Sequence, residues 1–254
     1  MRESLEVGVR PGGAVRGMST ETIKAAIFDL DGTLANTRPA ISRLLVKVAS
    51  EQGRAVTTRQ AASAMGKPPG TAFGQLLGMP EDHDTVLTAI SRYREQFACE
   101  VLGEGPQLLF PGVAAGLSAL RAHGIELAVA TSKATRSAET LLEVMGIRDL
   151  LGPVVCQDVV RRGKPHPELV LRAAAEVGVP PWECAYVGDT VGDMRMAVTA
   201  RMEPIAVTYG VGSFGELAAV AGTRMCSSFK DVVSTVAASR PRPMAAVGAQ
   251  PRRR

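Results

Sequence analysis

The sequence predicts an α/β fold: a three-layer, doubly wound parallel sheet with an inserted helical cap domain. Three observations lead to this prediction. Short apolar runs recur along the chain, helix-like segments separate the later runs, and one long helix-rich stretch separates the first two. With 254 residues, of which 46% are hydrophobic and 21% charged, the chain is long enough for one large core and a smaller second domain.

Five short apolar runs are predicted to be the strands of the sheet. They are too short to be buried helices, and their β-branched or continuously apolar character is typical of strands covered on both faces. The runs are residues 25–30, 126–130, 154–156, 184–187 and 205–207. Helix-like segments separate the later four from the first and from one another, at residues 113–123, 134–145, 167–177 and 192–200. Strands that alternate with helices favour a parallel sheet.

The long stretch between the first two strands is predicted to be a helical cap domain at residues 36–108. Proline and glycine divide it into helix-like segments, and it contains no strand-like alternation. The segments are residues 40–51, 58–65, 71–77 and 82–102. The core domain then comprises residues 23–35 and 109–239, with the cap above the carboxyl ends of the strands.

Both ends of the chain are predicted to be disordered, as an arm at residues 1–22 and a basic tail at residues 240–254. The formal net charge is +4, but the tail alone carries five arginines and no acid. The rest of the chain is therefore close to neutral, which argues against a nucleic-acid-binding face. A weak contact between the tail and an acidic partner is the alternative interpretation. No apolar stretch approaches the roughly 18 residues of a membrane span.

The cysteine pattern favours buried or idle thiols in a cytoplasmic protein. Cys99, Cys156, Cys184 and Cys226 stand far apart and form no CxxC pair, so neither a disulfide framework nor a zinc site is indicated. The first residues also lack the apolar segment of a secretory signal.

Acidic residues gather at the predicted carboxyl ends of two strands, where open α/β sheets bind their ligands. Asp29 and Asp31 stand two residues apart, so an extended chain places both carboxylates on one side. Asp189 and Asp193 follow the fourth strand. Four carboxylates in one partly dehydrated pocket repel one another unless a cation holds them. Because the set contains no cysteine or histidine, it favours Mg²⁺ over Zn²⁺.

Hydroxyl groups and a lysine at the same predicted edge indicate a phosphate ligand. Thr131 and Ser132 follow the second strand, and Lys164 follows the third. They supply hydrogen-bond donors and positive charge. Together with a metal ion, they neutralise a phosphoryl group enough for an anionic carboxylate to attack it.

Four ordered motifs resemble those of the haloacid-dehalogenase (HAD) superfamily: residues 28–34, Thr131, Lys164 with Pro165, and residues 188–193. The helical insertion after the first motif resembles the cap of phosphoglycolate-phosphatase-like members. The likeness covers most of the chain outside the two ends. It implies a Rossmann-like core, a Mg²⁺ cofactor and an aspartyl-phosphate intermediate.

The resemblance implies roles for the four acidic residues. Asp29 is the expected nucleophile and a metal ligand. Asp31 is expected to protonate the leaving alkoxide, then to activate the hydrolytic water, and to bind the metal through its backbone carbonyl. Asp189 is expected to bind Mg²⁺ directly, while Asp193 supports the metal shell or Lys164.

The resemblance also implies the groups that bind the substrate. Thr131, Ser132 and Lys164 are expected to bind the phosphoryl oxygens, and Lys164 also stabilises the nucleophile. In the cap, Gly66 and Lys67 are candidate substrate contacts, because cap loops in this superfamily often set specificity. An exposed turn without a functional role is the alternative for these two residues.

The second carboxylate, Asp31, favours phosphoryl transfer over dehalogenation, because a departing alkoxide needs a proton and a halide does not. The expected reaction is Mg²⁺-dependent hydrolysis of a small phosphomonoester, either phosphoglycolate-like or a sugar phosphate. Alternatives within enzymes are a β-phosphoglucomutase-like mutase, a pyrophosphatase, and a biosynthetic phosphatase of the aminohydroxybenzoate type. A non-catalytic regulator that binds a partner through the arginine tail is the alternative from another class. Oligomeric state is not indicated.

Three further signals have competing interpretations. Residues 210–215 match GxGxxG, but too little chain follows for a dinucleotide-binding fold, so a flexible loop is predicted. Lys133 is either a solvated lysine at a helix entry or a group that attracts an anionic substrate. Arg201 stands near the end of a predicted helix where relatives often have glycine, which predicts a local cost in loop geometry.

Overall fold

The computed structural model describes residues 23–239; the predicted arm and tail lie outside the described residues. Within that range six parallel strands form one sheet in the order β3-β2-β1-β4-β5-β6. The strands are β1 (Ala25–Phe28), β2 (Glu126–Thr131), β3 (Val154–Cys156), β4 (Cys184–Gly188), β5 (Glu203–Val207) and β6 (Arg224–Cys226). This topology confirms the predicted fold class.

The edge strand β6 was not predicted from the sequence. It has only three residues, and Cys226 is the one that is buried. An apolar run this short carries no usable signal of its own. Its pairing with β5 is what makes it a strand.

Helices cover both faces of the sheet, which gives the three layers. Alternate residues of β1 pack into different apolar clusters, Phe28 into one and Ile27 into the other. The first cluster includes side chains of α5 (Val113–Ala122), α6 (Thr135–Val144) and α10 (Phe229–Ala238). The second includes side chains of α7 (Glu168–Glu176) and α8 (Val191–Thr199). Since every residue of β1 is buried, its continuous apolar run has a direct structural cause.

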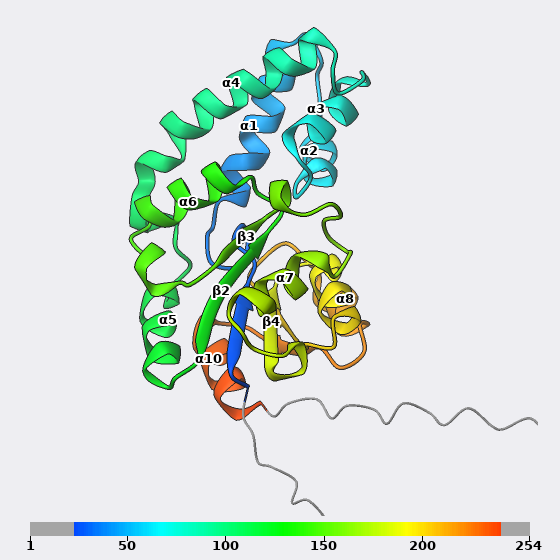
Figure 1. The fold of residues 1–254 in the computed structure, drawn as a ribbon. Helices are drawn as coiled ribbons and strands as arrows, with labels where there is room; N and C mark the ends of the chain where they lie inside the picture. The colour runs from blue at the N-terminus through cyan, green and yellow to red at the C-terminus, as the bar shows by residue number, and fades with distance from the viewer. Residues whose placement is uncertain (1–22, 240–254) are drawn as a thin grey trace, which may run out of the picture.

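A helical insert lies between β1 and β2, as the fold class predicts. Its elements are α1 (Arg38–Glu51), α2 (Thr58–Ala64), α3 (Pro69–Leu77), α4 (Asp84–Glu100) and a 3₁₀ helix (Leu102–Leu108). The insert has its own apolar cluster, in which Val48, Phe73 and Val86 are fully buried. Figure 1 shows its helices stacked beyond the end of the sheet at which β1 leads toward α1. We call this insert the cap.

Arg201, just after α8, has a strained backbone conformation. Arg201 has a φ of 61° and is the one non-glycine residue with positive φ in the described part of the chain. A side chain in this conformation costs about 1 kcal/mol relative to glycine. The turn after α8 therefore carries the local conformational cost that the sequence predicts.

Two compositional expectations can be compared with the structure. All four cysteines are free: Cys99 is exposed, and Cys156, Cys184 and Cys226 are buried. Across residues 23–239, no helix combines the length and apolarity that crossing a membrane requires.

Candidate active site

A cavity of about 280 Å³ lies where the core meets the cap. Five residues predicted to act at the site line it from the core: Asp29, Asp31, Thr131, Ser132 and Lys164. The two candidate contacts in the cap, Gly66 and Lys67, also line it. Three further cap residues that were not predicted line it as well: Arg38, Ile41 and Met65. The structure thus brings residues far apart in the sequence to one small space.

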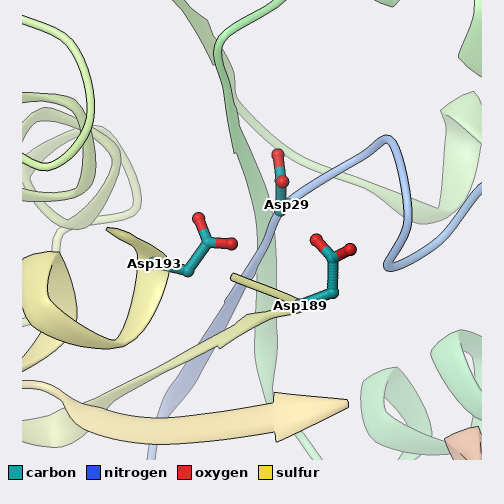
Figure 2. A group of neighbouring side chains, drawn as sticks. All are labelled: Asp29, Asp189 and Asp193. Carbon is teal, nitrogen blue, oxygen red and sulfur yellow. The ribbon is translucent and has the colours of Figure 1, made fainter. Parts of the chain in front are cut away.

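Three buried carboxylates form a cluster beside this cavity. Ligand oxygens of Asp29, Asp189 and Asp193 all lie within 4.8 Å of one another. Figure 2 shows that they come from three separate segments and point toward a common space. An all-oxygen set at this spacing fits a hard divalent cation such as Mg²⁺. We call these three residues the aspartate triad; it can bind a metal.

The pairing of β1 with β4 places two members of the triad. Phe28 lies opposite Val187, and the N–H of Asp29 donates to the carbonyl of Val187 at 2.9 Å. Asp189 follows two residues after Val187, so the two carboxylates emerge at the same edge. Gly188 is needed between them and α8, because a Cβ there would lie 2.6 Å from the Cβ of Asp193.

Lys164 provides positive charge next to the triad. Its Nζ lies 2.8 Å from Oδ1 of Asp29 and 2.8 Å from Oδ1 of Asp193, and its side chain is 12% exposed. Burial works against a charged lysine, but the two carboxylates outweigh it and raise the pKa of Lys164. Burial also raises the pKa of Asp29, with Lys164 opposing it.

Asp193 is held from two sides. Its Oδ2 accepts hydrogen bonds from the backbone N–H and the hydroxyl of Thr190 at 2.9 and 2.6 Å, in a capping box that begins α8. Burial alone would raise the pKa of Asp193, but Lys164 and Thr190 outweigh it and lower the pKa. Because both oxygens of Asp193 are engaged, its geometry suits the support of Lys164.

Asp31 has a different set of partners from Asp29. It accepts a hydrogen bond from the hydroxyl of Thr37, and its Oδ2 lies 3.0 Å from Nζ of Lys133. Burial would raise the pKa of Asp31, but Lys133 and Thr37 outweigh it and hold the pKa below its ordinary value. The same Nζ lies 4.8 Å from the centroid of the Phe97 ring, on α4. Lys133 is therefore a mostly buried partner of Asp31, and the interpretation of a solvated lysine is wrong.

The hydroxyls and the cap residues are placed differently. Thr131 is 2% exposed, and its Oγ1 accepts a hydrogen bond from the N–H of Lys133 at 3.2 Å. Gly66 and Lys67 follow α2 and are exposed, and the Lys67 ammonium donates to Gln75 on α3. The core hydroxyl is thus fixed, whereas the cap groups face solvent and the cavity.

Arg38 is the main residue that the sequence analysis missed. It begins α1, and its side chain is 14% exposed. Its Nη2 donates to Oδ1 of Asp189 at 3.0 Å, and its Nε donates to the backbone carbonyl of Asp31 at 3.1 Å. Burial raises the pKa of Asp189 to about 7, and Arg38 opposes that rise. A cation in the first turn opposes the helix dipole, so an arginine there was a usable signal that acids lie nearby.

The glycine-rich loop after β5 also belongs to the site. The N–H of Val211 donates to Oδ2 of Asp189, and the N–H of Gly212 donates to its backbone carbonyl, both at 3.0 Å. A Cβ at Gly210 would lie 2.3 Å from the Cβ of Asp189. The loop predicted to be flexible therefore cradles a member of the triad, and its glycines allow the close approach.

Comparisons with known proteins agree with this geometry. Residues 26–207 match the family model described as haloacid dehalogenase-like hydrolase. A probable phosphatase, IndB, from Dickeya dadantii (strain 3937) is 38% identical over 82% of this chain and 90% of its own length. The phosphoglycolate phosphatase of Escherichia coli (strain K12) is 30% identical over 77% of this chain and 85% of its own length.

A solved structure with the same fold is the β-phosphoglucomutase (pgmB) of Clostridium difficile. It superposes with a TM-score of 0.73 at 20% identity, over 83% of this chain and 93% of that chain. The architecture that this chain shares with that structure is an α/β sheet with a helical insert. The chain belongs to the haloacid dehalogenase-like hydrolase family. It is an enzyme of the phosphatase type, for which a phosphorylated small molecule is the substrate class.

Proposed function

We propose that this enzyme hydrolyses a small-molecule phosphomonoester in a Mg²⁺-dependent reaction through an aspartyl-phosphate on Asp29. One observation carries the proposal: Asp29 and Lys164 line one cavity, and the other two members of the aspartate triad lie next to Asp29. A nucleophile, a metal site and an anion-binding group are the three parts that attack on a phosphoryl group requires.

Three groups of this chain would hold the Mg²⁺: the carboxylates of Asp29 and Asp189 and the backbone carbonyl of Asp31. When bound, the ion supplies positive charge that screens the attacking carboxylate from the anionic phosphoryl group. Asp193 would act mainly through Lys164, because its oxygens already accept bonds from Lys164 and Thr190.

The remaining core residues would bind the phosphoryl group and move protons. Thr131 and Ser132 donate hydrogen bonds from one wall of the cavity, and Lys164 holds Asp29 in place for attack. Once the acyl-phosphate has formed, Asp31 accepts a proton from the attacking water. Lys133 and Thr37 favour its ionised form, which is the form needed in that step. To protonate the leaving alkoxide first, Asp31 must gain a proton as the substrate binds.

The cap would choose the organic part of the substrate. We place the cap domain at residues 36–108, with Gly66 and Lys67 facing the cavity beside the apolar Ile41 and Met65. A cavity of about 280 Å³ suits a compact metabolite. Phosphoglycolate-like acids and sugar phosphates are the first candidates. A phosphorylated biosynthetic intermediate is a further candidate.

The proposal is tested by release of inorganic phosphate from a generic aryl phosphate, followed by a panel of phosphorylated metabolites. We expect activity with Mg²⁺ and none after chelation. The Asp29→Asn variant should lose at least about 10³-fold in kcat, because the neutral amide cannot form the acyl-phosphate. Retention of a tenth of wild-type activity by this variant would contradict the nucleophile assignment. Isomerisation of a sugar phosphate that needs a bisphosphorylated activator would instead indicate a mutase.

A further inference from the structure

Arg38 contacts groups that are proposed to bind the metal, and the inference drawn from this contact rests on the proposed metal site. Its guanidinium contacts Oδ1 of Asp189 and the backbone carbonyl of Asp31. These are two of the three groups assigned above to Mg²⁺. The Arg38 guanidinium and a bound Mg²⁺ would therefore use the same two oxygen atoms.

Simultaneous binding of both cations to these oxygens is unfavourable. The other oxygen of Asp189, Oδ2, already accepts the N–H of Val211 and is fixed by the glycine-rich loop. A guanidinium and a metal ion within one ligand shell repel each other strongly, because the Arg38 side chain is 14% exposed and water screens the charges poorly. Mg²⁺ must therefore displace Arg38 from Asp189.

The local backbone is built to allow the guanidinium this close. Gly32 has a φ of 92°, and a Cβ there would lie 2.2 Å from Nε of Arg38 and 2.4 Å from Oδ2 of Asp189. Any side chain at this position would separate Arg38 from the first motif. The contact between Arg38 and Asp189 therefore depends on glycine at position 32 as well as on the attraction between the two charges.

We infer that Arg38 is an internal cation that competes with Mg²⁺ for Oδ1 of Asp189 and the backbone carbonyl of Asp31, and so couples metal binding to phosphate binding. Arg38 also lines the cavity, so an anion there offers the displaced guanidinium a new partner. Phosphate should then lower the cost of removing Arg38 from Asp189. Reciprocally, Mg²⁺ should tighten phosphate binding by the same factor.

Calorimetric titration of Mg²⁺ tests this inference without any turnover. We expect the Arg38→Met variant to bind Mg²⁺ at least about tenfold more tightly than the wild type in phosphate-free buffer, because the competitor is gone. Inorganic phosphate should strengthen Mg²⁺ binding by the wild type and have a much smaller effect on the variant. Arg43→Met, an exposed arginine on the same helix, is the matched control and should match the wild type.

A second measurement covers the case in which Arg38→Met folds poorly. Arg38→Gln keeps most of the side-chain length without the charge, and added Mg²⁺ should raise its melting temperature more than that of the wild type. Equal or weaker Mg²⁺ binding by both Arg38 variants would overturn the inference. If Asp189→Asn also leaves Mg²⁺ affinity unchanged, the metal site itself is wrong; if it abolishes binding, only the role of Arg38 fails.

Discussion

The two walls of the cavity differ in how their polar groups are held. On the core wall, Lys164 is paired with two buried carboxylates, and Lys133 is paired with the partly buried carboxylate of Asp31. On the cap wall, Gly66 and Lys67 are exposed, and Arg38 is the exception because it is paired with Asp189 of the core. Buried paired charges stay in one arrangement because any rearrangement leaves a charge without a partner in a poorly solvated space. The core wall is therefore suited to chemistry, and the cap wall can change its contacts from substrate to substrate.

The difference follows from how each wall is built. Core groups stand at the ends of parallel strands, whose backbone ladder fixes residues such as Asp29 and Asp189 relative to each other. The cap residues follow a short helix, α2, and are not fixed by a ladder. Substitutions on the core wall should therefore affect turnover and stability together, whereas substitutions on the cap wall should affect substrate affinity alone.

The largest expected effect is on the core wall, with Lys164→Met. The substitution leaves Asp29 and Asp193 without their shared cation in a buried site. We expect kcat to fall by about 10²–10³-fold, and the free energy of unfolding without added metal to fall by about 3–5 kcal/mol. Steady-state kinetics and urea denaturation measure the two changes.

The control for this variant is Lys230→Met, at an exposed lysine of α10. It removes the same charge far from the cavity and should leave both quantities nearly unchanged. A Lys164 variant with near-normal stability would break the comparison, because it would show that the core wall does not depend on charge pairing.

The second expected effect is on the cap wall, with Lys67→Ala. If Lys67 meets an anionic part of the preferred substrate, KM should rise about fivefold, the size of one exposed charge contact of about 1 kcal/mol. The kcat for a generic aryl phosphate should stay within a factor of two of the wild type, in line with an unaltered core wall. Arg59→Ala, an exposed cation on α2, is the matched control. A fall in kcat for every substrate would place Lys67 in the chemistry and remove the contrast between the walls.

The same contrast explains what the sequence could predict. The fold class and the convergence of Asp29, Asp31 and Asp189 were predictable because apolar strands and the acids that follow them are local patterns, and sheet topology does the rest. The edge strand β6 was missed because pairing, rather than composition, makes it a strand. The partnership of Lys133 with Asp31 depends on a side-chain direction that no local pattern encodes.

Arg38 shows a further limit of sequence reasoning. It lies only seven residues after Asp31, yet its function depends on Asp189, which is 151 residues farther along the chain. The unfavourable position of a cation at the start of α1 was the available signal. The glycine-rich loop was likewise classed as flexible, because its partner Asp189 is close in space and not in sequence.

The smallest expected effect concerns the reactivity of the cysteines, which compares the packing of the core with that of the cap and involves no catalysis. Cys99 is exposed on α4 in the cap, whereas Cys156, Cys184 and Cys226 are buried in the core strands β3, β4 and β6. Burial raises the pKa of Cys156 to about 11 and that of Cys184 to about 12. Thiols react as thiolates, and at pH 8 a pKa of this size leaves a thiolate fraction of about 10⁻³ or less.

We therefore expect iodoacetamide at pH 8 to modify one thiol per native chain, and peptide mass spectrometry to locate it at Cys99. In urea, the three core thiols should become reactive together, because they share one cooperative sheet. Cys99→Ser is the control and should abolish labelling of the native protein. Native labelling of Cys184 at the rate of Cys99 would show that the core opens as readily as the cap surface. The packing of the strands beneath the core wall could then not explain why its polar groups stay in one arrangement.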